Sequence, residues 1–316
     1  MNKFLVEILP VPFDYGVKLI NGRPGARFGP QKIMQEFQRL VKGEEIKSIK
    51  IVKHRAIRPI ATDVKRTHEI VTRVVRKIIK SGGIPVVIGG GHDISFGSGK
   101  AVFLEYKNLG QINLDAHYDV RPVVNGKITS GTPFRRLLEE RFLNGRNFVE
   151  LGIHAPKNLK EHHDYIIQKK GILLKLDYIN RIGIENALDK AFKIAAKNTN
   201  ATIFDIDIDG VQKRFAPGCS APCIKGFTKK QILLAAFIAG KNKNVKLFNL
   251  MEVNPLYDVN NKTVKLAAEL IFNFIKGLSK RENSYLWKIL LLKRQIDQCI
   301  LRKNPVKKYM QLQETL

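Results

Sequence analysis

Short apolar runs alternate along the chain with longer stretches in which apolar residues recur at helical spacing. The runs at 84–90, 110–117, 147–154, 171–177, 201–209 and 244–253 are typical of buried strands. The stretches 63–83, 228–240 and 262–277 have the apolar period of amphipathic helices, and the second begins at a capping Thr228 and ends at Gly240. This alternation predicts an α/β fold with a mostly parallel sheet and helices on both of its faces.

The last part of the chain has a different pattern. Between Lys276 and Lys308, ten residues are basic and two are acidic. Apolar residues recur there at spacings of four and three, at Tyr285, Ile289, Leu292, Ile296 and Cys299. We therefore predict a domain at 1–278 and a basic, amphipathic helical extension at 279–316. The apolar stripe would pack on its own domain, contact another subunit, or bind a membrane surface or an acidic partner.

Length and composition limit the class of protein. With 316 residues and 44% hydrophobic content, the chain can bury a sizeable core. No apolar run approaches the roughly 18 residues of a membrane span, and the start of the chain, MNKFLVEILP, lacks the features of a signal peptide. Three cysteines, Cys219, Cys223 and Cys299, are too few for a disulfide framework. We expect a cytoplasmic protein with no transmembrane segment.

The net charge of +27 is extreme, with 55 Lys and Arg residues against 28 Asp and Glu residues. Such a field attracts nucleic acid, an anionic membrane surface or an acidic small molecule. The basic residues are spread along the chain, and no glycine-rich phosphate loop, zinc finger or ribonucleoprotein motif accompanies them. We therefore expect no specific nucleic-acid partner and interpret most of the charge as a solvated basic surface.

Two of the predicted strands end in polar residues at every second position. NLDAHYD (113–119) contains Asp115, His117 and Asp119, and FDIDIDG (204–210) contains Asp205, Asp207 and Asp209. In a strand, residues two apart point to the same face. Ligands bind beyond the carboxyl ends of the strands in open α/β sheets. We expect both groups to converge there with His92, which follows the run at 84–90.

Carboxylates that converge in this way require cations. At about 4 Å and an effective dielectric constant near 20, each like-charged pair costs roughly 4 kcal/mol. One Asp-x-His-x-Asp motif alone is more typical of a solvated edge, but GGGHD (89–93), DAHYD (115–119) and DIDID (205–209), each at a strand end, together favour a metal site. The candidate ligands are His92, Asp115, His117, Asp119, Asp207 and Asp209. Their four carboxylates balance two divalent ions, and oxygen-rich ligation with two imidazoles favours two Mn²⁺ ions. Such a pair lowers the pKa of a shared water to about 7.

Four motifs resemble those of the ureohydrolases, a family that includes arginase, agmatinase and formimidoylglutamase. They are GGGHD (89–93), DAHYD (115–119), FDIDIDG (204–210) and MEVNP (251–255). The resemblance extends from about residue 13 to residue 278. It implies an arginase-like, three-layer αβα fold with a binuclear manganese centre at the six residues named above. It also implies a homo-oligomer, because the family commonly forms trimers or hexamers.

Other segments are similar to the formimidoylglutamase branch of this family. They are GVKLINGRPGARFGP (16–30), DVR (119–121), SGTPFR (130–135) and APGCSAP (216–222). Arginases have a Ser-Gly-Asn-x-His-Gly segment where this chain has SGTPFRR. The chain departs from the family at Asp205, where a Ser is usual, and in GVQKRF (210–215), which lacks the Asp-Pro of arginases and agmatinases.

The resemblance implies hydrolysis of N-formimino-L-glutamate to L-glutamate and formamide, a step of histidine degradation. A metal-bridging hydroxide would attack the formimino carbon, Glu252 would hold the cationic amidine, and Asp119 would pass a proton to the leaving amine. The small acidic substrate carries two carboxylates, so a cationic rim is expected. Arg121 is the first candidate for a bidentate clamp, followed by Arg135, Thr132 and Asn158.

Two other functions remain open from the sequence. A related hydrolase would act on another amidine or guanidine, and release of urea from arginine or agmatine would identify it. A non-catalytic binding or scaffolding protein would use the basic C-terminal helix, and it would bind no divalent ion at the predicted centre. The remaining histidines and Cys219 and Cys223 are interpreted as packing or loop residues, with His154 the one most apt to contact substrate.

Overall fold

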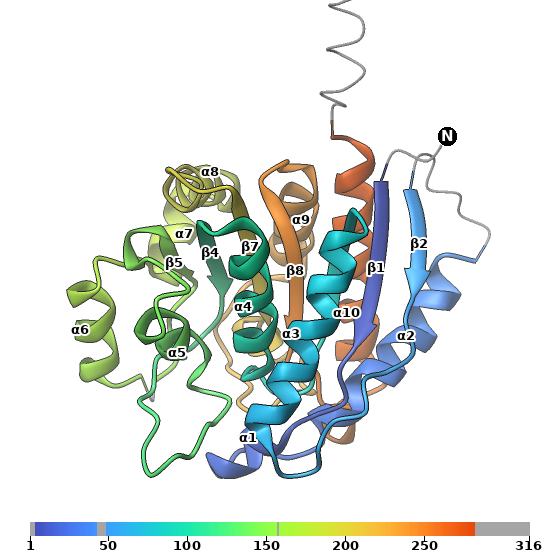
Figure 1. The fold of residues 1–316 in the computed structure, drawn as a ribbon, viewed down its shortest axis with the longest axis horizontal. Coiled ribbons are helices and arrows are strands. Elements are labelled where there is room, and N and C mark those ends of the chain that lie inside the picture. Colours follow the sequence, from blue (N-terminus) through green and yellow to red (C-terminus); the bar gives the residue numbers. More distant parts are fainter. Residues whose placement is uncertain (1–3, 43–48, 157, 282–316) are drawn as a thin grey trace, which may run out of the picture. The chain divides into compact units, whose positions relative to one another are not determined.

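One sheet of eight strands lies at the centre of the computed structural model, which describes residues 4–42, 49–156 and 158–281 (Figure 1). The strands are β1 (Phe4–Pro10), β2 (Ile49–Lys53), β3 (Gly83–Ile88), β4 (Leu109–Leu114), β5 (Phe148–Leu151), β6 (Ile172–Leu174), β7 (Ala201–Asp207) and β8 (Val245–Met251). Their order in the sheet is β2-β1-β3-β8-β7-β4-β5-β6. Every neighbouring pair is parallel, as the alternation of strands and helices predicts.

Helices cover both faces of this sheet. They are α1 (Tyr15–Leu19), α2 (Gly29–Leu40), α3 (Val64–Lys80), α4 (Ile94–Tyr106), α5 (Pro133–Glu139), α6 (Lys160–Gln168), α7 (Leu176–Ile182), α8 (Ile184–Ala195), α9 (Lys229–Lys241) and α10 (Lys262–Ser279). Short 3₁₀ turns occur at Ala26–Phe28, Gly145–Asn147, Ile208–Gly210 and Pro255–Tyr257. In Figure 1, α3 and α4 lie in front of the sheet, and α9 and α10 lie behind it. The three-layer αβα architecture is confirmed.

Each face of the sheet has its own hydrophobic core. Side chains of α2, α8, α9 and α10 pack in one core, and side chains of α3, α4, α5 and α6 pack in the other. Successive strand residues alternate between them: Val86 and Ile88 of β3 belong to the first core, and Val87 belongs to the second. Because both faces are covered, the strands have the near-continuous apolar sequences of a buried parallel sheet.

Local sequence signals set the ends of several helices. The side chain of Asp63 caps α3 by accepting a hydrogen bond from Arg66 N, and Thr228 and Gln231 form a capping box at the start of α9. The prediction that Gly240 ends this helix is wrong, because α9 continues to Lys241. A Cβ at Gly240 would lie 2.0 Å from Phe274 O, so this glycine permits close packing of α9 against α10.

The first compact unit of the chain extends from Met1 to Ser279. Apart from residues 279–281, the predicted basic extension lies outside the described residues, so its helix and the domain boundary stay predictions. Among the helices that the structure describes, none has the length and apolar content required to cross a bilayer.

Candidate metal centre

The candidate site lies where four central strands of the sheet end. The segments that follow β3, β4, β7 and β8 bring together His92, the 115–119 motif, Asp207 with Asp209, and Glu252. Because all four strands are parallel, their carboxyl ends meet at one edge of the sheet. The predicted convergence of the two aspartate motifs with His92 is therefore observed.

The way in which Asp115, His117 and Asp119 converge differs from the prediction. Strand β4 ends at Leu114, so the three residues lie on the following loop and not on a strand face. His117 N donates to Asp115 Oδ1 at 2.7 Å, which folds the loop back on itself. Asp119 has a φ of +45°, in the left-handed region, which further turns the chain. The side chains are therefore aimed by the turn and not by the alternation of a pleated strand.

The second aspartate motif also leaves the sheet before its last residue. Strand β7 ends at Asp207, and Asp209 belongs to the 3₁₀ turn Ile208–Gly210. The Asp207 side chain caps this turn by accepting a hydrogen bond from Asp209 N at 2.9 Å. The turn keeps the two carboxylates on the same side of the chain, where both line a cavity.

The six predicted ligands form two clusters that share one carboxylate. His92, Asp115, Asp119 and Asp207 form the first, which we call the His92 cluster, and Asp115, His117 and Asp209 form the second, the His117 cluster. In each cluster, one potential ligand atom from every residue lies within 4.8 Å of the others. Asp115 belongs to both, which is the arrangement expected of a carboxylate that bridges two ions.

Three carboxylates surround one nitrogen atom in the His92 cluster. His92 Nδ1 lies 2.8 Å from Asp119 Oδ2, 3.0 Å from Asp207 Oδ2 and 3.3 Å from Asp115 Oδ2. A single N–H can serve only one of these oxygens well. His92 and Asp115 are fully buried, so water does not screen the remaining repulsion. This geometry suits a cation held between the nitrogen and the oxygens.

The His117 cluster is more open. His117 Nδ1 lies 3.0 Å from Asp209 Oδ2 and 3.5 Å from Asp115 Oδ1. The side chain of His117 is 22% exposed, whereas that of Asp209 is 5% exposed. This cluster therefore lies nearer the mouth of the cavity than the His92 cluster does.

The pKa values of the cluster residues show how strongly they interact. Burial raises the pKa of Asp207 well above its usual range, and the adjacent Asp209 and Asp115 raise it further. Burial also raises the pKa of Asp209, to about 7, with Asp115 adding to the effect and His117 opposing it. Burial and Asp115 raise the pKa of Asp119. Burial and mutual repulsion therefore favour the protonated forms of these three carboxylates.

The pKa values of the two histidines and of Asp115 shift in the directions that favour their charged forms. Although burial disfavours their cationic forms, the surrounding carboxylates raise the pKa values of His92 and His117 well above normal. Burial disfavours the ionised form of Asp115, but His117 and His92 still hold its pKa below the usual range. A metal ion would displace these protons, since it binds neutral imidazole and ionised carboxylate.

Several buried polar atoms in this region have no hydrogen-bond partner among the described residues. They include Asp209 Oδ1 and Glu252 Oε2. Orphaned buried groups of this kind are rare in proteins and require an unseen partner. Oxygen-rich donors with two imidazoles and a shared carboxylate fit a pair of borderline-hard divalent ions such as Mn²⁺.

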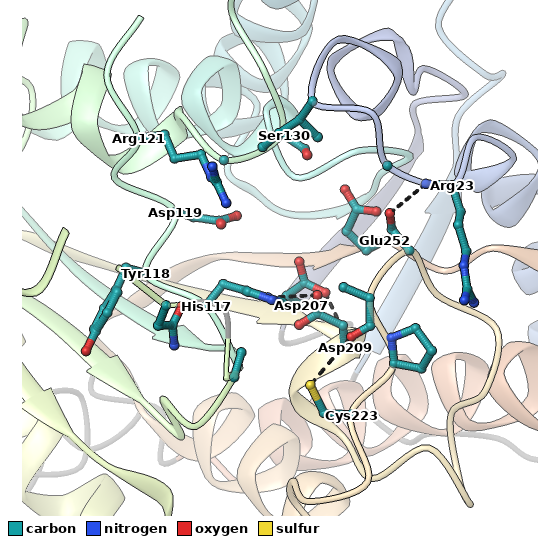
Figure 2. A pocket seen from close by; sticks show the side chains of 18 of the residues that line it. Arg23, His117, Tyr118, Asp119, Arg121, Ser130, Asp207, Asp209, Cys223 and Glu252 are labelled. Atoms are coloured by element: carbon teal, nitrogen blue, oxygen red, sulfur yellow. Dashed lines mark hydrogen bonds and ion pairs between the residues drawn. The ribbon is translucent and has the colours of Figure 1, made fainter. Parts of the chain in front are cut away.

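A cavity of about 530 Å³ opens above the clusters. Figure 2 shows the side chains of His117, Asp119, Asp207, Asp209 and Glu252 turned toward the same space. Cationic residues also line the cavity, namely Arg23, Arg121 and Lys213. The cavity therefore has the acidic clusters on one side and a basic wall on the other, which suits a ligand that carries negative charge.

Comparison with known proteins agrees with this arrangement. A family model described as the arginase family matches residues 5–276. The chain belongs to the arginase family.

Relatives and solved structures extend this assignment. This arginase-family chain is 32% identical over 275 residues to a formimidoylglutamase of Staphylococcus carnosus, an alignment that covers 85% of each chain. The crystal structure of Trypanosoma cruzi formiminoglutamase with Mn²⁺ superposes with a TM-score of 0.81 at 31% identity, covering 88% of this chain and 94% of that one. The formimidoylglutamase of Bacillus subtilis superposes with a TM-score of 0.83 at 25% identity, covering 90% and 89%.

The predicted substrate contacts of this arginase-family chain are not all at the cavity. Arg121, Asn158 and Glu252 line it, although Asn158 Nδ2 donates to Ala116 O at 2.8 Å. Thr132 and Arg135 do not line it. Thr132 is fully buried and donates its hydroxyl to Thr129 O at 2.8 Å. The Arg135 guanidinium lies 3.8 Å from the ring centre of Tyr165 and pairs with Glu139.

Sequence reasoning missed two basic residues of the cavity wall in this arginase-family chain. Arg23 belongs to the segment 16–30, and Lys213 belongs to the segment 210–215. The signal in the sequence for both is a cationic residue within a segment that is also informative about the family. His154, interpreted from the sequence as a packing or loop residue, faces the backbone carbonyls of Gly152 and Lys225.

Proposed function

We propose that this chain is a binuclear manganese hydrolase that cleaves N-formimino-L-glutamate to L-glutamate and formamide. The observation that carries the proposal is the pair of clusters sharing Asp115 beneath a cavity with a basic wall. The similarity to formimidoylglutamases over most of the chain supports the choice of substrate. Cleavage of the amidine C–N bond consumes one water, which supplies the oxygen of formamide and the second hydrogen of the amine.

The residues of the two clusters would hold the two ions. The His92 cluster would hold one, the His117 cluster would hold the other, and Asp115 would contact both. Bound there, two Mn²⁺ ions would supply Lewis acidity that lowers the pKa of a water toward 7 and so makes hydroxide available at neutral pH. Four carboxylates in the clusters balance the charge of two divalent ions.

Glu252 is placed to hold the cationic amidine of the substrate. Its Oε1 accepts a hydrogen bond from His92 N at 2.9 Å, and its buried Oε2 has no partner among the described residues. Its backbone has a φ of +65°, in the left-handed region that few non-glycine residues adopt. One oxygen is thus fixed by the protein, and the other is left for a ligand N–H. Burial raises the pKa of Glu252 well above its usual range, and a cation bound there would favour the ionised form.

Asp119 is placed to move a proton. It is a member of the His92 cluster, and its side chain is 13% exposed, so it reaches both the cluster and the cavity. A carboxylate in this position would take a proton as water adds to the amidine carbon. It would then pass the proton to the nitrogen of the departing glutamate, which must leave as a neutral amine.

Arg121 is the best-placed residue for a substrate carboxylate. It lines the cavity, and no acidic side chain pairs with it among the described residues. Its backbone N donates to Gly131 O at 2.7 Å. A Cβ at Gly131 would lie 2.7 Å from Arg121 Cδ, so glycine there leaves room for the arginine side chain. Arg23 and Lys213 on the cavity wall are available for the second carboxylate of formiminoglutamate.

The proposal is tested by incubating metal-free protein with formiminoglutamate, with and without Mn²⁺, and measuring formamide and glutamate. We expect both products in equal amounts and only when Mn²⁺ is present. Arginine and agmatine serve as alternative substrates, and release of urea from either at a higher rate would overturn the choice of substrate. Exposed apolar side chains at Ile224, Leu256 and Val259 support a homo-oligomer, which light scattering would measure. We place the reaction in the cytoplasm, where fractionation would locate the enzyme.

A further inference from the structure

A carboxylate outside the two clusters faces the far side of the His92 ring. Asp205 Oδ1 lies 3.4 Å from His92 Nε2, within ion-pair distance although the two atoms do not form a hydrogen bond, whereas the cluster oxygens surround Nδ1. Both residues are fully buried. Asp205 belongs to β7, and its register partners in the sheet are Asn113 of β4 and Asn249 of β8. It is also the position at which the sequence departs from the Ser that is usual in this motif.

Asp205 is fixed on all sides by hydrogen-bond donors. Its Oδ1 accepts from Ser95 Oγ at 3.1 Å, and its Oδ2 accepts from Asn249 Nδ2 at 2.8 Å and from Gln111 Nε2 at 3.4 Å. Asn249 Nδ2 is itself within 3.0 Å of Ser98 Oγ. These donors come from α4, β4 and β8, so three separate elements hold the carboxylate in one orientation.

We infer that Asp205 is a positioning residue that holds His92 in the tautomer with the proton on Nε2. The Nδ1 lone pair then points at the ion of the His92 cluster, and that ion is bound more tightly. The inference rests on the proposed binuclear centre. The physical reason is that a carboxylate facing the outer nitrogen of a ligating histidine favours the proton on that side of the ring and increases the basicity of the other nitrogen. A serine at this position would be shorter and uncharged, so it would orient the His92 ring less strongly and increase the basicity of Nδ1 less.

The two histidines of the centre differ in this respect. The closest carboxylate contacts of His117 both involve Nδ1 and come from Asp115 and Asp209, which are members of its own cluster. His92 has a carboxylate on each side of the ring. Loss of the Asp205 carboxylate should therefore weaken one ion and leave the other largely unchanged. A general loss of stability would affect both ions together.

The test compares manganese binding to metal-free wild-type protein, Asp205→Ser and Asp205→Asn. Free Mn²⁺ is measured by its electron paramagnetic resonance signal, which gives a dissociation constant for each site. We expect one constant to rise by about 10- to 100-fold and the other to stay constant. Glu7→Gln is the matched control, because Glu7 is a buried carboxylate 2.5 Å from His54 Nε2 and does not line the cavity. It should change neither constant.

Two results would overturn the inference. One is that both constants remain unchanged in the Asp205 variants, and the other is that both rise equally while the metal-free melting temperature falls. A wild-type protein that fails to bind two Mn²⁺ ions would instead remove the proposed function. In that case the role of Asp205 would fail because the binuclear centre itself is absent.

A second measurement does not depend on the folding of the Asp205 variants. Wild-type protein labelled with ¹⁵N-histidine and loaded with diamagnetic Zn²⁺ is examined by NMR, and the His92 signals are assigned by their absence in His92→Asn. We expect a proton on Nε2 and none on Nδ1. A proton on Nδ1, or a crystal structure in which Asp205 itself binds the ion, would contradict the assigned role.

Discussion

The substitution Asp209→Asn should remove one of the two proposed metal sites and leave the other. We expect it to lower the stability of the protein when Mn²⁺ is present and to raise the stability of the metal-free protein. Asp209 is a member of the His117 cluster alone, so the His92 cluster keeps all of its residues. Asparagine has nearly the same shape, and the hydrogen bond from the backbone N of residue 209 to Asp207 Oδ1 does not involve the changed side chain. We expect the variant to bind one Mn²⁺ ion per chain and the wild type to bind two.

The magnitude with metal follows from mass action. A free Mn²⁺ concentration 100 times the dissociation constant stabilises the folded protein by about 2.7 kcal/mol per site. Two sites therefore contribute roughly 5 kcal/mol, and one site contributes half of that. For a domain of this size, each kcal/mol raises the melting temperature by about 2–4 °C. Mn²⁺ should raise the melting temperature of the wild type by roughly 10–20 °C and that of the variant by about half as much.

Without metal, the substitution should raise the stability of the protein. The pKa of Asp209 is raised from 3.8 to about 7, so the folded state binds more protons than the unfolded state between these values. The free energy of unfolding of the metal-free protein therefore falls as pH rises through this window, by up to about 1.4 kcal/mol per pH unit. At pH 8 the accumulated loss is up to about 4 kcal/mol. Asparagine does not titrate, so metal-free Asp209→Asn should be more stable than metal-free wild type at pH 8.

The assay is calorimetric unfolding at pH 8 with excess Mn²⁺ and with chelator, together with metal analysis of the dialysed protein. Asp164→Asn is the matched control, because Asp164 is half exposed on α6 and pairs with Lys160. It should change neither the metal content nor the response to Mn²⁺. Asp115→Asn should lose both ions, because Asp115 is the shared member of the clusters. If Asp209→Asn retains two tightly bound ions, or is destabilised in chelator, the division into two clusters is wrong.

Three further predictions concern residues around the ions. Arg121→Lys should raise KM for formiminoglutamate about tenfold with unchanged metal content, because lysine cannot form a bidentate pair with a carboxylate. The control is Arg135→Lys, which changes a residue away from the cavity. If the KM of Arg121→Lys equals that of the wild type, Arg121 does not bind the substrate. Glu252→Gln should lower kcat by roughly 10²- to 10³-fold while both ions still bind, since it removes the charge that faces the amidine; rates near wild type would refute this role. Burial, followed by Asp115, raises the pKa of Glu150 well above 4.5, so ionised Glu150 is disfavoured in the folded state and the free energy of unfolding falls as pH rises above that value. The melting temperature of Glu150→Gln should therefore fall less than that of the wild type between pH 5 and pH 8. Glu161 is at an exposed position, so the melting temperature of Glu161→Gln should change with pH as that of the wild type does.

The local pattern of the sequence was sufficient for the fold class and for the candidate ligands, although it did not predict strands β1 and β2. Alternating apolar runs and helical stretches predict a parallel sheet between helices, because burial of both sheet faces requires that pattern. The motifs at 115–119 and 204–210 identify the chemistry, because several carboxylates and two imidazoles have few uses together other than binding cations. These conclusions depend on residue types and on short spacings, which sequence expresses directly.

The tertiary structure decided how these residues meet. The turn after Leu114 and the 3₁₀ turn after Asp207 aim the ligands, and their conformations depend on contacts with other segments. Residues far apart in the chain become partners, as His92 N and Glu252 Oε1 do. The same contacts turn Arg135 toward Tyr165 and away from the cavity, and they place Asp205 behind His92. Spacing along the chain contains no information about such neighbours, because they are set by the packing of β3, β7 and β8 with α4.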